Sequence, residues 1–130
     1  MRHKILFAAS LLALTAFSAP VLAGEMPGGI KSGQSGLGTI LTDSKGMTLY
    51  YFDPDPAGKS VCNGKCAKAW PPVMAQGNAA SDGDFTIVVR DDGSKQWAHL
   101  GKPLYAWIKD KKPGDTTGHR VGDKWTAAQP

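Results

Sequence analysis

The chain has little of the chemistry that marks most enzymes and nucleic-acid-binding proteins. It holds three arginines, three histidines and two cysteines, and its net charge is only +4, with lysines mixed among aspartates. It therefore lacks the clustered basic face that nucleic-acid binding needs. It also lacks a nucleophile elbow, a phosphate-binding glycine loop and paired carboxylates in a recognised context. We expect a non-enzymatic protein with no catalytic residues, no cofactor and no nucleic-acid partner.

The one long apolar run stands at the N-terminus and is too short for a comfortable membrane span. Basic residues 2–4 precede an almost wholly apolar run over residues 5–19, and residues 21–23 supply small or compact side chains for cleavage before Gly24. This order predicts a secretory signal peptide over residues 1–23, with an uncleaved anchor helix as the alternative. No cysteine follows the run, so we expect no lipid anchor and a periplasmic or secreted product. Two basic residues leave with the signal, so the mature chain carries a net charge of +2.

What remains has the length of one domain. Residues 24–38 are rich in Gly, Ser and Pro and hold almost nothing apolar, which predicts a flexible N-terminal lead-in. The ordered domain is expected over residues 39–130. We divide it into two repeats, the first over about 39–75 and the second over about 85–130.

The division rests on internal self-similarity. Residues 46–55 align with residues 101–110 at an offset of 55 residues, with matching Gly, Leu, Tyr, aromatic and Asp positions. The same offset brings Trp70 onto Trp125 without a gap. One such match arises easily by chance, but two matches in register indicate a tandem duplication.

Each repeat has the pattern of a β-hairpin. The β-branched runs at residues 39–42 and 85–90, which we align with each other, end in the turn segments 43–46 and 91–94. Residues 65–70 are good helix formers and stop before two prolines, which predicts one short helical turn. The fold class is therefore mainly β: a single small domain of two tandem hairpin repeats, with a short helical turn near the cysteine pair.

One motif occurs twice, as Tyr50, Phe52 and Asp55 and again as Tyr105, Trp107 and Asp110. The two copies resemble the bacterial family of predicted lipoproteins with a Y-x-[FWY]-x-x-D motif, also called the secreted repeat of unknown function. The Cys62-x3-Cys66 pair and the Ala69-Trp70-Pro71-Pro72 stretch are similar to its first repeat. The resemblance implies an envelope location and paired repeats, and it implies no activity. This chain lacks the lipid-modified N-terminal cysteine that many members carry.

The repeated motif has two interpretations. As a binding site, its rings and carboxylates line one cleft between the repeats and hold a cation, a sugar or a quinone-like ring. As a structural element, its rings fill the core and its aspartates cap turns. The repetition favours the structural interpretation, because both copies need the same packing. Strand alternation places Tyr50 and Phe52 on one face and Tyr51 on the other.

The cysteines and histidines leave several kinds of site open. In an oxidising compartment Cys62 and Cys66 are expected to form a disulfide, whose short loop contributes about 2 kcal/mol. A redox dithiol or a metal site is the alternative, although zinc needs further ligands that do not flank the pair. His99 and His119, together with methionines, leave a copper site as another alternative. We expect no metal.

Together these patterns predict an exported envelope protein of unknown activity that binds an unknown small ligand or an envelope protein through the motif face. One alternative is a periplasmic metal-binding or redox accessory protein. Another is a structural or stress-related envelope module.

Overall fold

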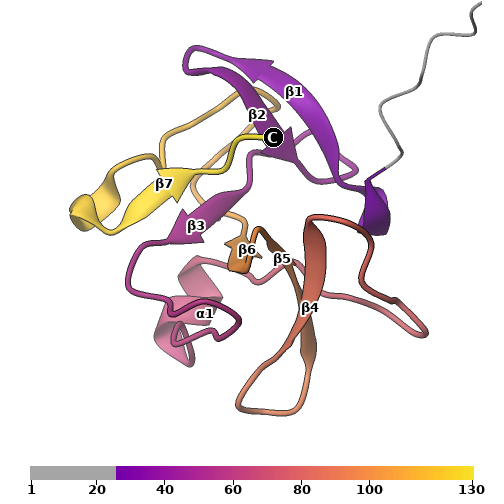
Figure 1. Cartoon of the computed structure of the whole chain (residues 1–130). Coiled ribbons are helices and arrows are strands. Elements are labelled where there is room, and N and C mark those ends of the chain that lie inside the picture. Colours follow the sequence, from indigo (N-terminus) through magenta and orange to yellow (C-terminus); the bar gives the residue numbers. More distant parts are fainter. Residues whose placement is uncertain (1–25) are drawn as a thin grey trace, which may run out of the picture.

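The computed structural model describes residues 26–130, and the predicted signal peptide over residues 1–23 lies outside them. A two-stranded and a five-stranded sheet, both antiparallel, make up the fold (Figure 1). The small sheet is the hairpin of β1 (Lys31–Ser35) and β2 (Gly38–Thr42). The large sheet runs in the order β4-β5-β6-β3-β7, with bounds β3 (Tyr50–Phe52), β4 (Phe85–Val89), β5 (Lys95–His99), β6 (Lys102–Tyr105) and β7 (Trp125–Ala127).

Helical structure is brief. The α-helix α1 (Lys65–Ala69) includes one cysteine of the Cys62–Cys66 disulfide. Two 3-10 turns, η1 (Pro27–Gly29) and η2 (Val121–Asp123), complete the elements. The predicted fold class is confirmed: the domain is mainly β, with one short helix beside the disulfide.

The two repeats are related by an approximate twofold axis at the β3–β6 pair. Tyr50 lies directly opposite Tyr105 across this pair. On the outer side of β3, Ala127 of β7 lies opposite Tyr50. On the other side of the axis Pro72, which is 55 residues before Ala127, forms the matching bridge to Tyr105. Because proline has no N–H to donate, this counterpart of β7 makes a bridge and not a full strand.

The ordered domain begins earlier than the sequence predicted. Residues 31–35, inside the predicted flexible lead-in over 24–38, form β1 and pair along their whole length with β2. Ile30, just before β1, is buried in the core. Composition misled because β1 is held by its backbone bonds to β2 and not by burial of its polar side chains. Gly38 makes the tight return possible, since its φ of +93° is open to glycine without steric cost.

The correct repeat alignment follows from β1. With the offset of 55 residues, β1 corresponds to β4 and β3 corresponds to β6. The sequence analysis instead aligned residues 39–42 with residues 85–90, and this pairing is wrong. Each repeat therefore starts with an equivalent strand, β1 in the first repeat and β4 in the second. The polar composition of β1 hid this strand in the sequence.

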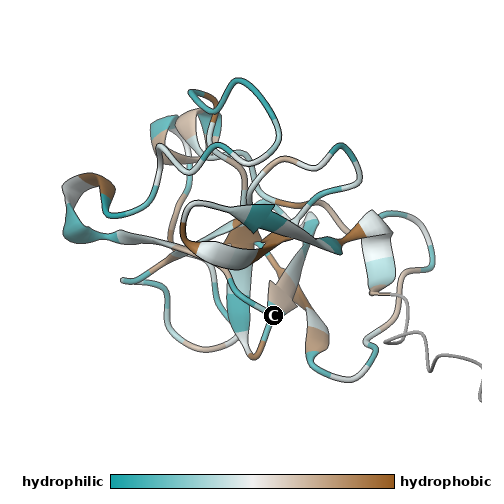
Figure 2. Ribbon diagram, turned by 90° about the horizontal axis from the view of Figure 1, so that it is seen from above, coloured by the Kyte–Doolittle hydropathy of each residue, from teal (hydrophilic) through white to brown (hydrophobic). Residues whose placement is uncertain are grey.

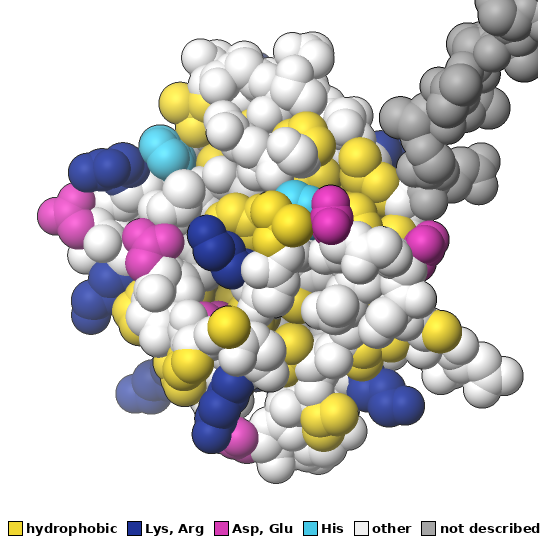
Figure 3. Space-filling view, in the orientation of Figure 1, with side chains coloured by type: hydrophobic (Ala, Val, Ile, Leu, Met, Phe, Trp, Pro, Cys, Tyr) yellow, Lys and Arg dark blue, Asp and Glu magenta, His cyan; other side chains and the backbone are white. Residues whose placement is uncertain are grey.

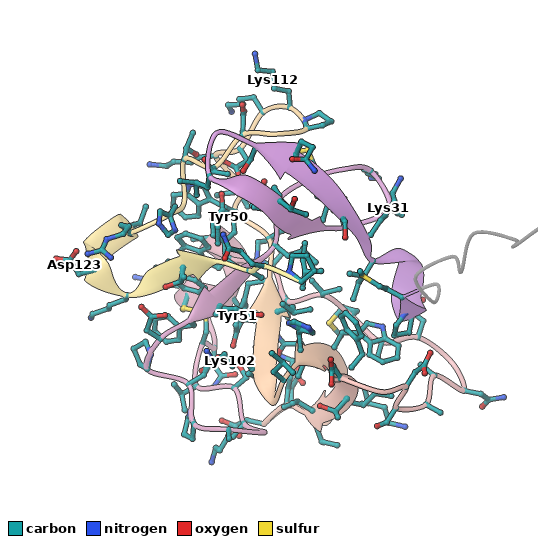
Figure 4. All side chains as sticks on the ribbon, turned by 45° about the horizontal axis from the view of Figure 1, so that its top comes forward. Lys31, Tyr50, Tyr51, Lys102, Lys112 and Asp123 are labelled. Atoms are coloured by element: carbon teal, nitrogen blue, oxygen red, sulfur yellow. A yellow bond between two sulfur atoms is a disulfide. The ribbon has the colours of Figure 1, made fainter. Side chains whose placement is uncertain are left out.

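Alternation along β3 divides the core into two clusters. Tyr50 belongs to an aromatic cluster that Phe52 also contacts, whereas Tyr51 belongs to a second, mixed cluster with Leu41 and Leu104, which we call the Tyr51 cluster. Figure 4 shows Tyr50 and Tyr51 on opposite sides of the strand. Seen from above, hydrophobic segments lie mainly where the strands cross and hydrophilic segments mainly in the outer turns (Figure 2).

Candidate functional site

The motif tyrosines lie at the centre of the molecule. Tyr50 and Tyr105 are both 0% exposed, on the adjacent strands β3 and β6. Each ring meets a tryptophan edge-on, Tyr50 with Trp70 at 5.4 Å between centroids and Tyr105 with Trp125 at 5.3 Å. The structure thus places both tyrosines in the core and not on the wall of a cleft.

Each motif tyrosine bonds the aspartate of the other repeat. The Tyr50 hydroxyl donates to Asp110 Oδ2 at 2.6 Å, and the Tyr105 hydroxyl donates to Asp55 Oδ2 at 2.6 Å. We call these two crossed bonds the tyrosine–aspartate clamps. They fasten the two repeats to each other at the pseudo-twofold axis, which a motif considered within one repeat does not reveal.

The remaining oxygen of each aspartate holds its own loop. Asp55 Oδ1 accepts a bond from the Val61 N–H at 2.7 Å. Asp110 Oδ1 accepts bonds from the Thr117 N–H at 3.0 Å and the Thr117 hydroxyl at 2.6 Å. The aspartates therefore act as loop caps, as the structural interpretation of the motif expects, and as clamp acceptors.

Burial determines the protonation chemistry of the clamps. Burial, and then the bond to Asp110, raises the pKa of Tyr50 well above its usual range. Burial, and then the bond to Asp55, does the same to the pKa of Tyr105. Burial also raises the pKa of Asp55, against the opposing effects of the Tyr105 bond and of Arg90. The clamp tyrosines thus remain proton donors across the range of pH in which proteins are folded.

A buried arginine supports one clamp and not the other. Arg90 is 6% exposed, and its Nη1 donates to Ser60 Oγ at 2.9 Å and to Gln96 Oε1 at 2.8 Å. Its Nη2 donates to the Cys62 carbonyl at 2.7 Å. Ser60 Oγ in turn lies 2.6 Å from the Tyr105 hydroxyl. Sequence reasoning missed this network, although a single arginine inside the predicted β-run at 85–90 was an available signal.

Four aromatic rings form a continuous stack beside the clamps. The order is Phe52, Trp125, Trp70 and Trp107, with successive centroid distances of 4.4, 3.7 and 3.8 Å. The inner rings, Trp70 and Trp125, lie within 5° of parallel and are buried. Both are the repeat-equivalent tryptophans, so the pseudo-twofold axis passes between them. The aromatic residues of the motif are the two half-buried ends of the stack.

The two ends of the stack differ in chemistry. Trp107 is followed by Ile108, which is 54% exposed, and by Lys109, whose Nζ lies 5.7 Å from the Trp107 ring centroid. Phe52 is followed by Asp53, which accepts a bond from the Thr126 hydroxyl at 2.9 Å. We call the first end, made of Trp107, Ile108 and Lys109, the Trp107 end. It is apolar and cationic, whereas the Phe52 end is acidic.

The other sequence candidates have local roles. Cys62 and Cys66 form the predicted disulfide. His99 Nδ1 lies 2.7 Å from the Tyr51 hydroxyl, and His119 Nδ1 accepts the Ala127 N–H at 3.0 Å. Across residues 26–130 no three His, Cys, Asp or Glu side chains gather as a metal site would require.

Two shallow cavities lie away from the motif. One of about 210 Å³ lies between β1 and the loop at Pro113 and Gly114. The other, of about 440 Å³, lies beside Met74 and Trp97. No residue of either motif copy lines them. On the visible face the apolar surface is broken up by polar atoms, and basic side chains are spaced apart with aspartates between them (Figure 3).

Comparison with known proteins identifies both repeats. Residues 31–74 and 86–129 each match the model of a family described as "Secreted repeat of unknown function". No curated protein and no solved structure gives a significant match. Over residues 26–130 no helix has the length and hydrophobicity to cross a membrane.

Proposed function

The chain belongs to the family of secreted repeats of unknown function, and we propose that it is an exported, non-enzymatic binding module of the cell envelope. It binds at the Trp107 end of the aromatic stack. The observation that carries this assignment is a rigidly backed, half-exposed tryptophan with an exposed aliphatic side chain and an ammonium group beside it.

The stack gives Trp107 the properties of a binding platform. Its inner face rests on Trp70 at 3.8 Å, so the ring is already ordered before a ligand arrives. An ordered aromatic face binds another ring with little further loss of conformational entropy. Ile108 widens the apolar surface, and its N–H bond to the Ala69 carbonyl at 3.2 Å ties it to α1. The Lys109 ammonium lies over the Trp107 ring at 5.7 Å from its centroid, and this positive charge suits an anionic substituent.

These features favour a ring-bearing, negatively charged ligand, such as a carboxylated sugar of an envelope glycan. The Phe52 end lacks this combination, because an aspartate follows its ring. The clamps support a non-enzymatic role, since their donors and acceptors are engaged with each other. Their tyrosines titrate far from the neutral range in which a general acid or base works best.

Binding is tested by following the indole N–H signals of the four tryptophans by NMR during titration with a hexuronic acid, which is a carboxylated sugar, and with its uncharged amide. We expect the acid to shift the Trp107 signal, which Trp107→Phe assigns by removing it, and the amide to shift it less. Lys109→Ala should weaken binding, whereas the matched Lys124→Ala, on the other side of the stack, should leave it unchanged. Equal weakening by both lysine variants, or an unmoved Trp107 signal, contradicts the assignment.

Export is tested separately on protein recovered from the periplasm or the medium. Because the signal peptide is predicted over residues 1–23, we expect N-terminal sequencing to begin at Gly24. Intact Met1 in the membrane fraction would show instead that the segment remains as an anchor.

A further inference from the structure

β4 is an outer strand of the large sheet (Figure 1), so one side of its backbone faces no other strand within residues 26–130. The Arg90 N–H bonds the Ser94 carbonyl at 2.8 Å, and the Leu100 N–H bonds the Asp84 carbonyl at 2.8 Å. In an antiparallel pair, bonded positions alternate with positions that face away. Between these two ends, therefore, Ile87 and Val89 point their backbone groups away from β5.

The opposite strand confirms this orientation. Ile87 lies across from Trp97, and Val89 lies across from Lys95. The Trp97 N–H bonds the Val73 carbonyl at 2.8 Å, and the Lys95 carbonyl accepts the Ala75 N–H at 2.8 Å, both on the far side of β5. The N–H and C=O groups of Ile87 and Val89 thus have no hydrogen-bond partner within residues 26–130.

The open stretch is short and has an apolar side chain at its tip. Phe85 closes the start of β4 by exchanging two backbone bonds with Asp82, at 2.8 and 3.0 Å. Beyond it Ile87 is half-buried against the Tyr51 cluster and Val89 is 64% exposed. An exposed apolar edge of this kind pairs readily with another strand unless the protein protects it.

The charged residues around β4 determine which kind of strand can pair with its edge. Asp82 and Asp84 precede β4, and Asp91 and Asp92 follow it. A second copy that paired its Val89 with Ile87 in antiparallel register would set Asp84 of each copy opposite Asp92 of the other. Like charges directly opposite are destabilising, so the edge is protected against self-pairing. Lys95 is the one cation across from β4, since Arg90 is buried within the molecule.

We propose that the β4 edge binds an extended segment of a partner protein by strand addition. The segment has a short β-branched centre, whose backbone bonds Ile87 and Val89, and lysine or arginine at both ends to meet the aspartates. This surface is separate from the Trp107 end, and the proposal does not depend on ligand binding there.

The first test is amide hydrogen exchange with a synthetic peptide of sequence Thr-Val-Thr-Val-Thr carrying two lysines at each end. Exchange slows only where an amide gains a hydrogen bond or is excluded from water. We expect selective slowing at Ile87 and Val89 in the unaltered protein. Protection that appears elsewhere, with these two amides unchanged, overturns the proposal without any variant being made.

A variant pair isolates the backbone contribution. Val89→Pro removes an N–H that points outward, a change that edge strands accept, whereas Val89→Thr keeps the N–H and the β-branched shape. We expect the proline variant to bind the peptide about fivefold more weakly, because it loses one backbone bond of about 1 kcal/mol and a tenfold change corresponds to about 1.4 kcal/mol. The threonine variant should bind like the parent. Equal affinity of all three proteins overturns strand addition.

A second pair isolates charge. Replacing the lysines of the peptide by glutamates should abolish binding, and Asp82→Asn with Asp84→Asn should weaken binding of the lysine peptide about threefold. Equal binding of both peptides overturns the basic-partner assignment. So does a concentration-dependent dimer, detected by sedimentation, that Val89→Pro dissociates, because it would show that a second copy occupies the edge.

Discussion

The Tyr50–Asp110 and Tyr105–Asp55 clamps occupy equivalent places about one axis and have different surroundings. Both tyrosines are fully buried and both clamp bonds measure 2.6 Å. Asp110 is buried, whereas Asp55 is only half-buried. Duplication has therefore preserved the bond at the axis while the two carboxylates meet water to different degrees.

The second hydrogen-bond partner of each clamp tyrosine hydroxyl differs as well. Tyr105 shares its hydroxyl with Ser60 and, through it, with the buried guanidinium of Arg90. The Tyr50 hydroxyl accepts the Gly118 N–H at 3.2 Å. A Cβ at Gly118 would lie 2.8 Å from Tyr50 Cζ, so only glycine allows this approach. One clamp thus depends on a charged network and the other on close backbone packing, and this difference is open to experiment.

The largest effect is expected from removing either clamp ring. Tyr50→Ala and Tyr105→Ala should each lower the free energy of unfolding by about 3–5 kcal/mol, as for other large aromatic truncations in cores. A domain of this size holds only about 5–15 kcal/mol in total, so urea unfolding will show the loss plainly. Similar losses at both sites would show that the rings are equivalent. A folded variant with nearly unchanged stability at either site would contradict the packing role of that ring and make it a candidate ligand contact.

The arginine network separates the clamps. Arg90→Met should lower the free energy of unfolding by about 3 kcal/mol. It leaves buried hydrogen-bond acceptors without their donor, and each such acceptor costs about 1–3 kcal/mol. Arg120→Met is the control, since Arg120 is exposed and, among residues 26–130, its side chain forms an ion pair only with Asp123, at 3.9 Å. Such a surface pair is worth about 0–1 kcal/mol. Equal losses in both variants would show that the Arg90 network adds nothing to the Tyr105 clamp.

Removing one hydroxyl compares the clamps directly. Tyr50→Phe leaves the buried Asp110 Oδ2 and the Gly118 N–H without their partner, so we expect a loss of about 2 kcal/mol. Tyr105→Phe leaves Asp55 half-open to water and Ser60 still bonded to Arg90, so we expect about 1 kcal/mol. Urea unfolding of the two variants side by side measures the difference. The reverse order would mean that the arginine network, and not burial of the carboxylate, sets the strength of a clamp.

Local sequence pattern was sufficient for much of this architecture. Alternation placed Tyr50 and Phe52 on one face, and the offset of 55 residues matched Trp70 to Trp125. Helix propensity placed the predicted turn over residues 65–70, where α1 lies. These features depend on neighbours in the chain, which sequence periodicity records.

Local sequence pattern could not predict the contacts between the two repeats. The crossing of the clamps depends on β3 pairing with β6, and pairing partners of short strands leave no trace in composition. β1 was missed because backbone bonding, not side-chain burial, holds it. Arg90 was missed because burying a cation needs several acceptors from distant segments, which no local motif encodes.

The smallest expected effect is the pH dependence of the half-buried carboxylate. Burial raises the pKa of Asp55 above its ordinary value of 3.8. Between that value and the raised one, the folded protein binds more protons than the unfolded chain, so the free energy of unfolding falls as pH rises. Asp55→Asn should remove this fall, in urea titrations from about pH 3 to about pH 6. Asp92 is the opposite control: the Ser94 hydroxyl bond lowers the pKa of Asp92, so its contribution grows as pH rises towards the ordinary value. If Asp55→Asn removes a rise and not a fall, the Tyr105 bond outweighs burial in setting the pKa of Asp55.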